Sequence, residues 1–172
     1  MIVKFDEIPE DGLALHLTET AWIPGEEISW QGPVDASIFL GKNGERILCE
    51  GSLRLTLLLD CDRCLEQFAA PLETEFKIDF ELLPADLAQQ DFASEHECSE
   101  AEMDVVYLEE PLIDIHATLA QQLYLAMPEK RLCGEECQGL CPVCGVNRNL
   151  EQCDCAKKSG LSPFGVLARL KH

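Results

Sequence analysis

The feature that most constrains this chain is a cluster of six cysteines within the 23 residues 133–155. Zinc binds four thiolates in a tetrahedron, and two intervening residues let both sulfurs of a pair reach one ion. The run Cys141-Pro142-Val143-Cys144-Gly145 has this spacing, and its glycine permits a tight turn after the second ligand. We expect no signal peptide from residues 1–7, so these thiols indicate metal binding rather than a disulfide framework.

The spacing predicts one primary zinc site and leaves a second site open. The primary site takes the strongest pair and the next pair downstream, namely Cys141, Cys144, Cys153 and Cys155. The possible second site takes Cys133, Cys137, Cys61 and Cys64. In one alternative Cys137 replaces Cys153 or Cys155, and in another Cys61 and Cys64 are buried apolar residues of a turn. An iron–sulfur cluster fits less well, because the spacing does not match ferredoxin-type runs.

Alternating apolar residues predict an antiparallel β core in the first two thirds of the chain. Leucines alternate within residues 13–17 and 53–59, and apolar residues alternate again within 76–82. Residues 34–40 and 46–49 flank a Gly-Lys-Asn-Gly turn signal, which is typical of a hairpin. Period two places one face of each strand on a core.

Two helices and one acidic loop complete the predicted fold. A helix is expected over residues 111–127, with Pro111 in its first turn and Pro128 after its end. A last helix is expected to begin at Ser162, and residues 84–104 are expected to form an acidic loop with one short helix. The predicted class is α+β: an antiparallel β core with one packed helix over 1–128, then a zinc-knuckle segment and a terminal helix over 129–172.

Acidic side chains dominate the charge, with 13 Lys and Arg against 32 Asp and Glu, net −19. Residues 1–128 hold six basic and 27 acidic side chains, net −21, and residues 129–172 hold seven and five, net +2. Such a body repels phosphate backbones and attracts a basic protein, although acidity also serves solubility. The expected partner-binding residues are Arg63, Asp86, Asp91, Glu95, Glu97, Glu100 and Glu102.

The sequence carries none of the common catalytic motifs, and its histidines lie outside the cysteine cluster. We therefore expect a non-enzymatic, cytoplasmic protein with zinc as its cofactor, and neither a membrane nor a small-molecule substrate. One alternative is a direct RNA-binding zinc module using Arg63, Lys130, Arg131, Arg148, Lys157 and Lys158. The other is a thiol redox or metal-handling protein, which needs a reactive pair at Cys61 and Cys64.

The run Leu59-Asp60-Cys61-Asp62-Arg63-Cys64, followed by Phe68, resembles the Cys-x-Arg-Cys signature of the bacterial YceD family, the large ribosomal RNA subunit accumulation proteins. Residues 111–128 are similar to the family's helix and its proline-ended exit. Residues 137–155 are similar to the cysteine-rich segment of many members, and residues 162–171 to the family's last helix. The resemblance covers about residues 48–172. Members with the full cysteine segment often place Asp-Pro-Arg before the last helix, where this chain has Ser162-Pro163-Phe164.

The resemblance implies a role in the synthesis, processing or stability of large-subunit (23S-type) ribosomal RNA, and therefore in ribosome biogenesis. Combined with the charge, it implies a basic ribosomal protein or the assembling large subunit as partner, with limited direct RNA contact. Since relatives exist without the C-terminal cysteines, the zinc site is expected to stabilise the C-terminal segment rather than to perform the family's shared task.

Overall fold

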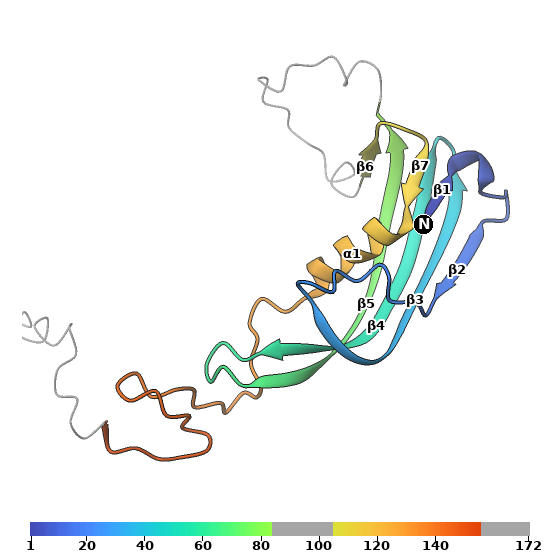
Figure 1. Cartoon of the computed structure of the whole chain (residues 1–172). Helices are drawn as coiled ribbons and strands as arrows, with labels where there is room; N and C mark the ends of the chain where they lie inside the picture. Colours follow the sequence, from blue (N-terminus) through green and yellow to red (C-terminus); the bar gives the residue numbers. More distant parts are fainter. Residues whose placement is uncertain (84–104, 156–172) are drawn as a thin grey trace, which may run out of the picture. The chain divides into compact units, whose positions relative to one another are not determined.

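The computed structural model describes residues 1–83 and 105–155 of the chain (Figure 1). The expectations for residues 84–104 and 156–172, an acidic loop with a short helix and a terminal helix, lie outside the described residues. The chain divides into two compact units. Unit 1 comprises Met1–Leu58 and Ala69–Met127, and unit 2 comprises Leu59–Phe68 together with the chain from Pro128 onward.

Unit 1 is built on a five-stranded sheet in the order β2-β3-β4-β5-β6. Its strands are β2 (Leu13–Leu17), β3 (Ser29–Asn43), β4 (Arg46–Asp60), β5 (Gln67–Leu82) and β6 (Val105–Leu108). The last residues of β4 and the first of β5 belong to unit 2. A separate two-stranded antiparallel sheet pairs β1 (Ile2–Lys4) with β7 (Leu112–Asp114), and the short 3-10 helix η1 (Phe5–Glu7) follows β1.

The predicted alternation is confirmed, with longer strands than expected. Leu53, Leu55 and Leu57 of β4 are all buried, which places one face of the strand on the core. Burying each such leucine contributes about 1.5–3 kcal/mol. The two strand segments expected before and after residue 50 form one continuous strand, β4. The hairpin turn is tighter than expected, since Asn43 pairs with Arg46 and leaves only two residues between the strands.

The expectation of an antiparallel core does not hold at one edge of the sheet. β2 with β3 and β3 with β4 pair antiparallel, but β6 runs parallel to β5, with Asp79 opposite Val105. A parallel neighbour requires a crossover connection of a dozen or more residues. The chain between β5 and β6 is long enough for one, but alternation along a single strand carries no information about the direction of its neighbour.

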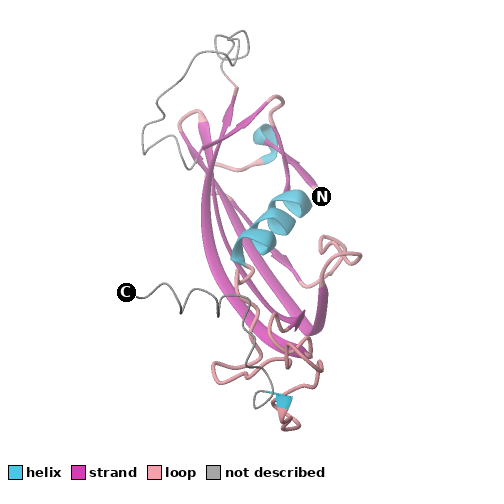
Figure 2. Ribbon diagram, turned by 90° about the vertical axis from the view of Figure 1, so that its left-hand side faces the viewer, coloured by secondary structure: helices cyan, strands magenta, loops and turns pink. Residues whose placement is uncertain are grey.

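The predicted helix exists but begins later than expected. It is α1 (Ile115–Ala126), and residues 112–114 form β7 instead, because they pair with β1. Asp114 caps the helix, since its carboxylate accepts hydrogen bonds from the backbone N–H groups of His116 and Ala117. Ile115, Leu119 and Leu123 of the expected stripe are buried. Figure 2 shows α1 lying across one face of the long strands.

Among the described residues, no helix combines the length and the apolar character needed to cross a membrane.

Candidate metal centres

Unit 2 brings eight cysteines into two groups of four. The first cysteine group is Cys61, Cys64, Cys133 and Cys137, and the second cysteine group is Cys141, Cys144, Cys153 and Cys155. Within each group all four sulfurs lie within 4.8 Å of one another. Each predicted ligand set is therefore brought together. The alternative in which Cys137 joins the second group is wrong, because Cys137 Sγ lies 3.8 Å from Cys61 Sγ in the first.

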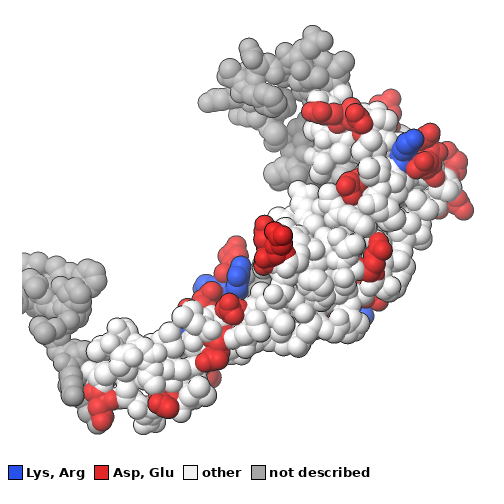
Figure 3. All heavy atoms as spheres, in the orientation of Figure 1, with Lys and Arg blue, Asp and Glu red and all other residues white. Residues whose placement is uncertain are grey.

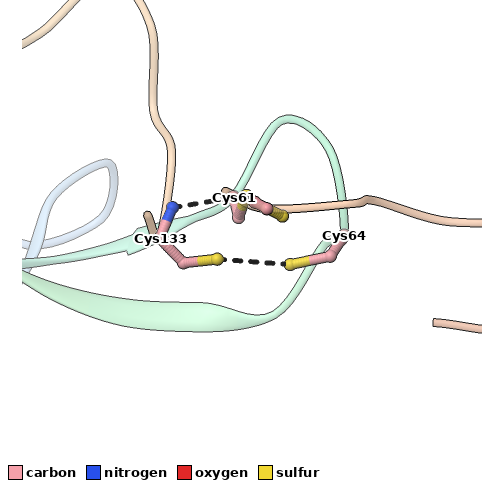
Figure 4. A group of neighbouring side chains, drawn as sticks. Cys61, Cys64 and Cys133 are labelled. Atoms are coloured by element: carbon pink, nitrogen blue, oxygen red, sulfur yellow. Dashed lines mark hydrogen bonds between the residues drawn. The ribbon is translucent and has the colours of Figure 1, made fainter. Parts of the chain in front are cut away.

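The sulfur–sulfur distances fit a shared tetrahedral ion. Cys61 Sγ and Cys137 Sγ are 3.8 Å apart. Cys64 Sγ and Cys133 Sγ are 3.7 Å apart (Figure 4). Four zinc–sulfur bonds of about 2.3 Å at tetrahedral angles place neighbouring sulfurs about 3.8 Å apart. A disulfide would bring them to about 2.05 Å. The described cysteines are all free, and either group could hold one soft metal ion.

The first half of the first group is a tight turn at the end of the β4–β5 hairpin, residues 61–66, which we call the first turn. The Cys61 N–H donates to the Glu66 carbonyl at 3.0 Å, and the Leu65 N–H donates to the Cys61 carbonyl at 2.9 Å. Leu65 has φ +60°, a left-handed conformation that is unfavourable for a residue with a Cβ. Figure 4 shows the Cys64 sulfur facing the Cys133 sulfur, and the Cys133 backbone N–H donates to the Cys61 sulfur at 3.4 Å.

Residues 141–146, which we call the second turn, repeat this geometry. The Cys141 N–H donates to the Val146 carbonyl at 2.8 Å, and the Gly145 N–H donates to the Cys141 carbonyl at 2.8 Å. Gly145 has φ +75°, as its position after the second ligand predicted. The isolated bridge between Leu140 and Asn147 closes the base of the turn. The two Cys-x-x-Cys segments therefore share one backbone design.

Asp62 and Arg63, between the two ligands of the first turn, hold the segment that carries Cys133 and Cys137. The Asp62 N–H donates to the Arg131 carbonyl at 2.7 Å, and the Asp62 carboxylate accepts from the Arg131 N–H at 2.8 Å. The Arg63 guanidinium donates to the carbonyls of Glu135 and Cys137 at 3.3 and 3.0 Å. Arg63 was expected to contact a partner, but its guanidinium makes internal hydrogen bonds that hold the segment carrying Cys137.

Gly139 lies between the two cysteine groups, at a position with no room for a side chain. It lies between Cys137 of the first group and Cys141 of the second, is buried, and has φ +67°. A Cβ at this position would lie 2.8 Å from the Arg63 carbonyl oxygen and 3.2 Å from the Arg63 Cβ. The same carbonyl accepts the Leu140 N–H at 2.9 Å. Only glycine satisfies both the conformation and the close approach.

Backbone N–H groups lower the pKa of one thiol in each group. The Cys133 N–H is the largest of the influences that lower the pKa of Cys61 to about 6. The N–H groups of Cys144 and Val143 lower the pKa of Cys141 to about 5. Hydrogen bonds to the charged form of an acid favour ionisation. Since the thiolate is the form that ligates metal, each group is prepared for a cation.

The sequence did not show that two polar residues, Arg148 and Asn149, lie next to the sulfurs. The Cys141 sulfur next to the Arg148 guanidinium raises the pKa of Arg148. The Asn149 side-chain N–H donates to Cys137 Sγ at 3.3 Å, and this bond lowers the pKa of Cys137. Neither residue type is diagnostic of a metal site, and no spacing rule marks them. Both lie next to cysteines of the two groups without belonging to either group, which is where residues that tune a bound metal are commonly found.

The expected partner-binding carboxylates, Asp86, Asp91, Glu95, Glu97, Glu100 and Glu102, lie outside the described residues. Among the basic residues of the RNA-binding alternative, Lys157 and Lys158 also lie outside them.

Comparison with known proteins identifies the family. The family model described as "Large ribosomal RNA subunit accumulation protein YceD" matches residues 49–171. The curated relative "Large ribosomal RNA subunit accumulation protein YCED homolog 1, chloroplastic" from Arabidopsis thaliana is 24% identical over 157 residues, covering 81% of this chain and 49% of the relative. The chain therefore spans about half the length of that relative. No solved structure matches the chain.

The matched region contains the first turn, α1 and all eight cysteines of the two groups. It also contains Asp62 and Arg63, which hydrogen-bond to the segment that carries Cys133 and Cys137. The chain belongs to the YceD family of large ribosomal RNA subunit accumulation proteins.

Proposed function

We propose that this chain is a non-enzymatic factor of ribosome biogenesis that supports the synthesis, processing or stability of large-subunit ribosomal RNA by binding a basic ribosomal protein. Membership of the YceD family carries this proposal, because the family is named for accumulation of the large ribosomal RNA. The relative from Arabidopsis thaliana carries the same description. The charge of the described surface is the argument for a protein partner.

The described part of unit 1 contains 17 Asp and Glu and five Lys and Arg. Four of its basic side chains already lie within ion-pair distance of a carboxylate, in the pairs Lys42–Glu10, Arg46–Glu81, Arg54–Glu73 and Lys77–Glu50. Figure 3 shows acidic groups on the face in view with few basic ones between them. Such a surface attracts a basic partner and repels nucleic acid.

Direct RNA binding by unit 2 has less support. Its described residues hold four Lys and Arg against eight Asp and Glu. Two of these basic side chains have internal partners, since Arg63 donates to backbone carbonyls and the Arg148 guanidinium interacts with the Cys141 sulfur, which raises its pKa. Neutralising phosphates requires free, convergent cations. A bound metal ion with four thiolates would add further negative charge to each group.

We propose zinc as the ion in both groups. Four thiolates in a tetrahedron are typical of structural zinc sites, and such a site leaves no open position for catalysis. The thiol redox alternative has less support, because Cys61 and Cys64 are 0% and 3% exposed and thiol exchange requires access of an attacking sulfur. Zinc would hold the first turn to the segment that follows α1.

The proposed role can be tested in cells that lack the gene. We expect the ratio of large- to small-subunit ribosomal RNA to fall, and the intact chain to restore it. A variant with Cys64→Ser should restore it poorly, whereas the Cys49→Ser variant, altered at a cysteine outside both groups, should restore it fully. An unchanged ratio in the deletion strain would remove the proposed role.

The proposed partner can be tested with purified components. The immobilised chain is incubated with the total proteins extracted from large ribosomal subunits, and separately with large-subunit ribosomal RNA. We expect salt-sensitive retention of a basic protein and weak retention of RNA. Deleting residues 84–103 should lower both the affinity and its salt dependence.

A charge-matched pair of variants separates a specific contact from general acidity. One variant neutralises Asp86, Asp91, Glu95, Glu97, Glu100 and Glu102 as amides. The control neutralises six exposed carboxylates elsewhere, at Asp6, Asp11, Glu26, Glu45, Glu109 and Glu110. Greater loss in the first variant would support the segment as the contact. Equal loss would mean that only net charge matters.

A further inference from the structure

Asn149 belongs to the segment of the second cysteine group but contacts a ligand of the first. It lies between Cys144 and Cys153 in sequence. Its side-chain N–H donates to Cys137 Sγ at 3.3 Å, and its side-chain oxygen accepts the Gln138 backbone N–H at 2.8 Å. The carboxamide thus makes one bond to a sulfur of the first group and one to the residue beside it.

The second turn sets the position of this carboxamide. The Asn149 N–H donates to the Asn147 side-chain oxygen at 3.0 Å, and the Asn147 carbonyl accepts N–H groups of Leu150 and Glu151 at 3.1 and 2.9 Å. Asn147 in turn forms the bridge with Leu140 at the base of the second turn. Asn149 can therefore keep its place at Cys137 only while the segment 145–151 keeps its fold.

A metal-bound thiolate keeps lone pairs that accept hydrogen bonds, and donors in the surrounding shell increase metal affinity by about 10- to 100-fold. An ion in the second group would fix both ends of segment 145–151, because its ligands lie on either side. Without that ion the segment gains conformational freedom and the donor at Cys137 is lost part of the time. Filling one group therefore changes the environment of a ligand in the other.

We propose that Asn149 couples the two cysteine groups, so that metal in the second group raises the metal affinity of the first. This inference rests on the proposed metal binding by both groups. Coupling between two binding sites is reciprocal, so metal in the first group raises the affinity of the second by the same factor. Asn149 is a positioning residue in this account, and it is not a ligand.

The test measures zinc binding by each cysteine group separately in the full chain. Protein is equilibrated at a series of free zinc concentrations set by a chelator buffer, then alkylated, digested with trypsin and analysed by mass spectrometry. The peptide with Cys64 reports the first group, and the peptide with Cys153 and Cys155 reports the second. The readout is the free zinc concentration that gives half-protection of each peptide.

We expect Asn149→Ala and Cys144→Ser each to raise the half-protection concentration of the Cys64 peptide by about tenfold. Together they should raise it little further than Cys144→Ser alone, because the donor is already absent for much of the time when the second group is empty. Gln152→Ala is the matched control: it changes an exposed amide directly after segment 145–151, and for it the described structure shows no hydrogen bond. It should shift the concentration less than twofold.

Asn149→Asp separates the bond to sulfur from the bond to the backbone. Aspartate keeps the acceptor for the Gln138 N–H but places a carboxylate beside Cys137, so we expect a larger shift than for alanine. A smaller shift than for alanine would mean that Asn149 only braces the backbone, and would overturn the proposal. The proposal would also be overturned if the double variant raised the half-protection concentration of the Cys64 peptide by the product of the two separate factors. That result would leave the proposed metal binding standing. Absence of zinc protection in both peptides would overturn the coupling and the proposed zinc sites together.

Discussion

The first and second turns have the same backbone geometry but different sequences. Both close with an N–H bond from the first cysteine to the carbonyl five residues later, and both place the residue after the second cysteine in a left-handed conformation. In the second turn that residue is Gly145, but in the first it is Leu65, which is also 67% exposed. A left-handed conformation costs about 1–2 kcal/mol for a residue with a Cβ. The first turn therefore retains a strained residue that the second avoids.

The two groups also differ in what they connect. The second group takes all four ligands from residues 141–155. The first joins Cys64 to Cys133 across 69 positions of the chain. Asp62 and Arg63 make additional bonds across the first group, which the corresponding residues of the second turn, Pro142 and Val143, cannot make through similar side chains. The same backbone turn therefore occurs in a group whose cysteines are close together in the chain and in a group whose cysteines are far apart.

The largest expected difference is between Cys64→Ser and Cys144→Ser in excess zinc. Each variant should lose one ion, and structural zinc sites in small domains bind with about 10–16 kcal/mol. Loss of the first group should free the segment after α1, so trypsin should cleave rapidly after Arg131. Loss of the second should expose Arg148 while cleavage after Arg131 stays slow. Mass spectrometry of a limited digest checks this. Identical cleavage patterns in the two variants would mean that the two groups do not differ in which segment they hold in place.

Gly139→Ala should destabilise unit 2 by about 2 kcal/mol, because it combines a left-handed conformation with a contact of 2.8 Å to the Arg63 carbonyl. Gly134→Ala is the control, since a Cβ there meets nothing within 4 Å. The measurement is the chelator concentration that removes half of the zinc. Equal sensitivity of the two variants would mean that the close approach at Gly139 is unimportant.

Arg63→Ala and Arg131→Ala remove the same charge but different bonds. Arg63 loses two side-chain hydrogen bonds, whereas the bonds from Arg131 to Asp62 use its backbone. We expect Arg63→Ala to cost about 1 kcal/mol, a rise of about fivefold in the zinc needed to protect the peptide carrying Cys64. Arg131→Ala should change it less than twofold. If both variants bind zinc normally and lose RNA binding equally, the direct RNA-binding alternative gains support.

The smallest expected effects come from exchanging the residue types at the left-handed positions. Leu65→Gly should stabilise unit 2 by about 0.5 kcal/mol, because relief of the unfavourable conformation exceeds the added entropy of the unfolded chain. Gly145→Ala should destabilise it by about 1 kcal/mol, although a Cβ there meets nothing within 4 Å. We expect Leu65→Gly to raise, and Gly145→Ala to lower, the chelator concentration that removes half of the zinc. If Leu65→Gly lowered that concentration, the leucine side chain itself would contribute to stability.

The sequence predicted which cysteines lie together in each group, because two-residue spacing within a pair is what a tetrahedral ion requires. Gly145 was predictable since glycine tolerates the left-handed conformation. Leu65 was not, because leucine carries no turn signal, and its left-handed conformation accompanies the backbone hydrogen bonds that close the first turn. Arg63 was interpreted as a partner contact, since a sequence does not show that its guanidinium reaches carbonyls more than 70 residues away.

The fold was predictable to a similar extent. Alternation located β4 and β5, and spacing located the buried face of α1. The start of α1 was wrong because residues 112–114 have a strand partner at the other end of the described chain, a long-range pairing that local propensity does not encode. The parallel direction of β6 was missed for the same physical reason.

The most direct test of the account is the number of metal ions per chain. Protein dialysed against zinc and then against metal-free buffer is analysed for zinc, sulfur and iron, together with Cys64→Ser and Cys144→Ser. The account predicts two zinc ions in the unmodified chain and one in each variant. A single zinc that survives Cys64→Ser would show that the first group holds no metal, and no zinc at all would contradict the account of both groups.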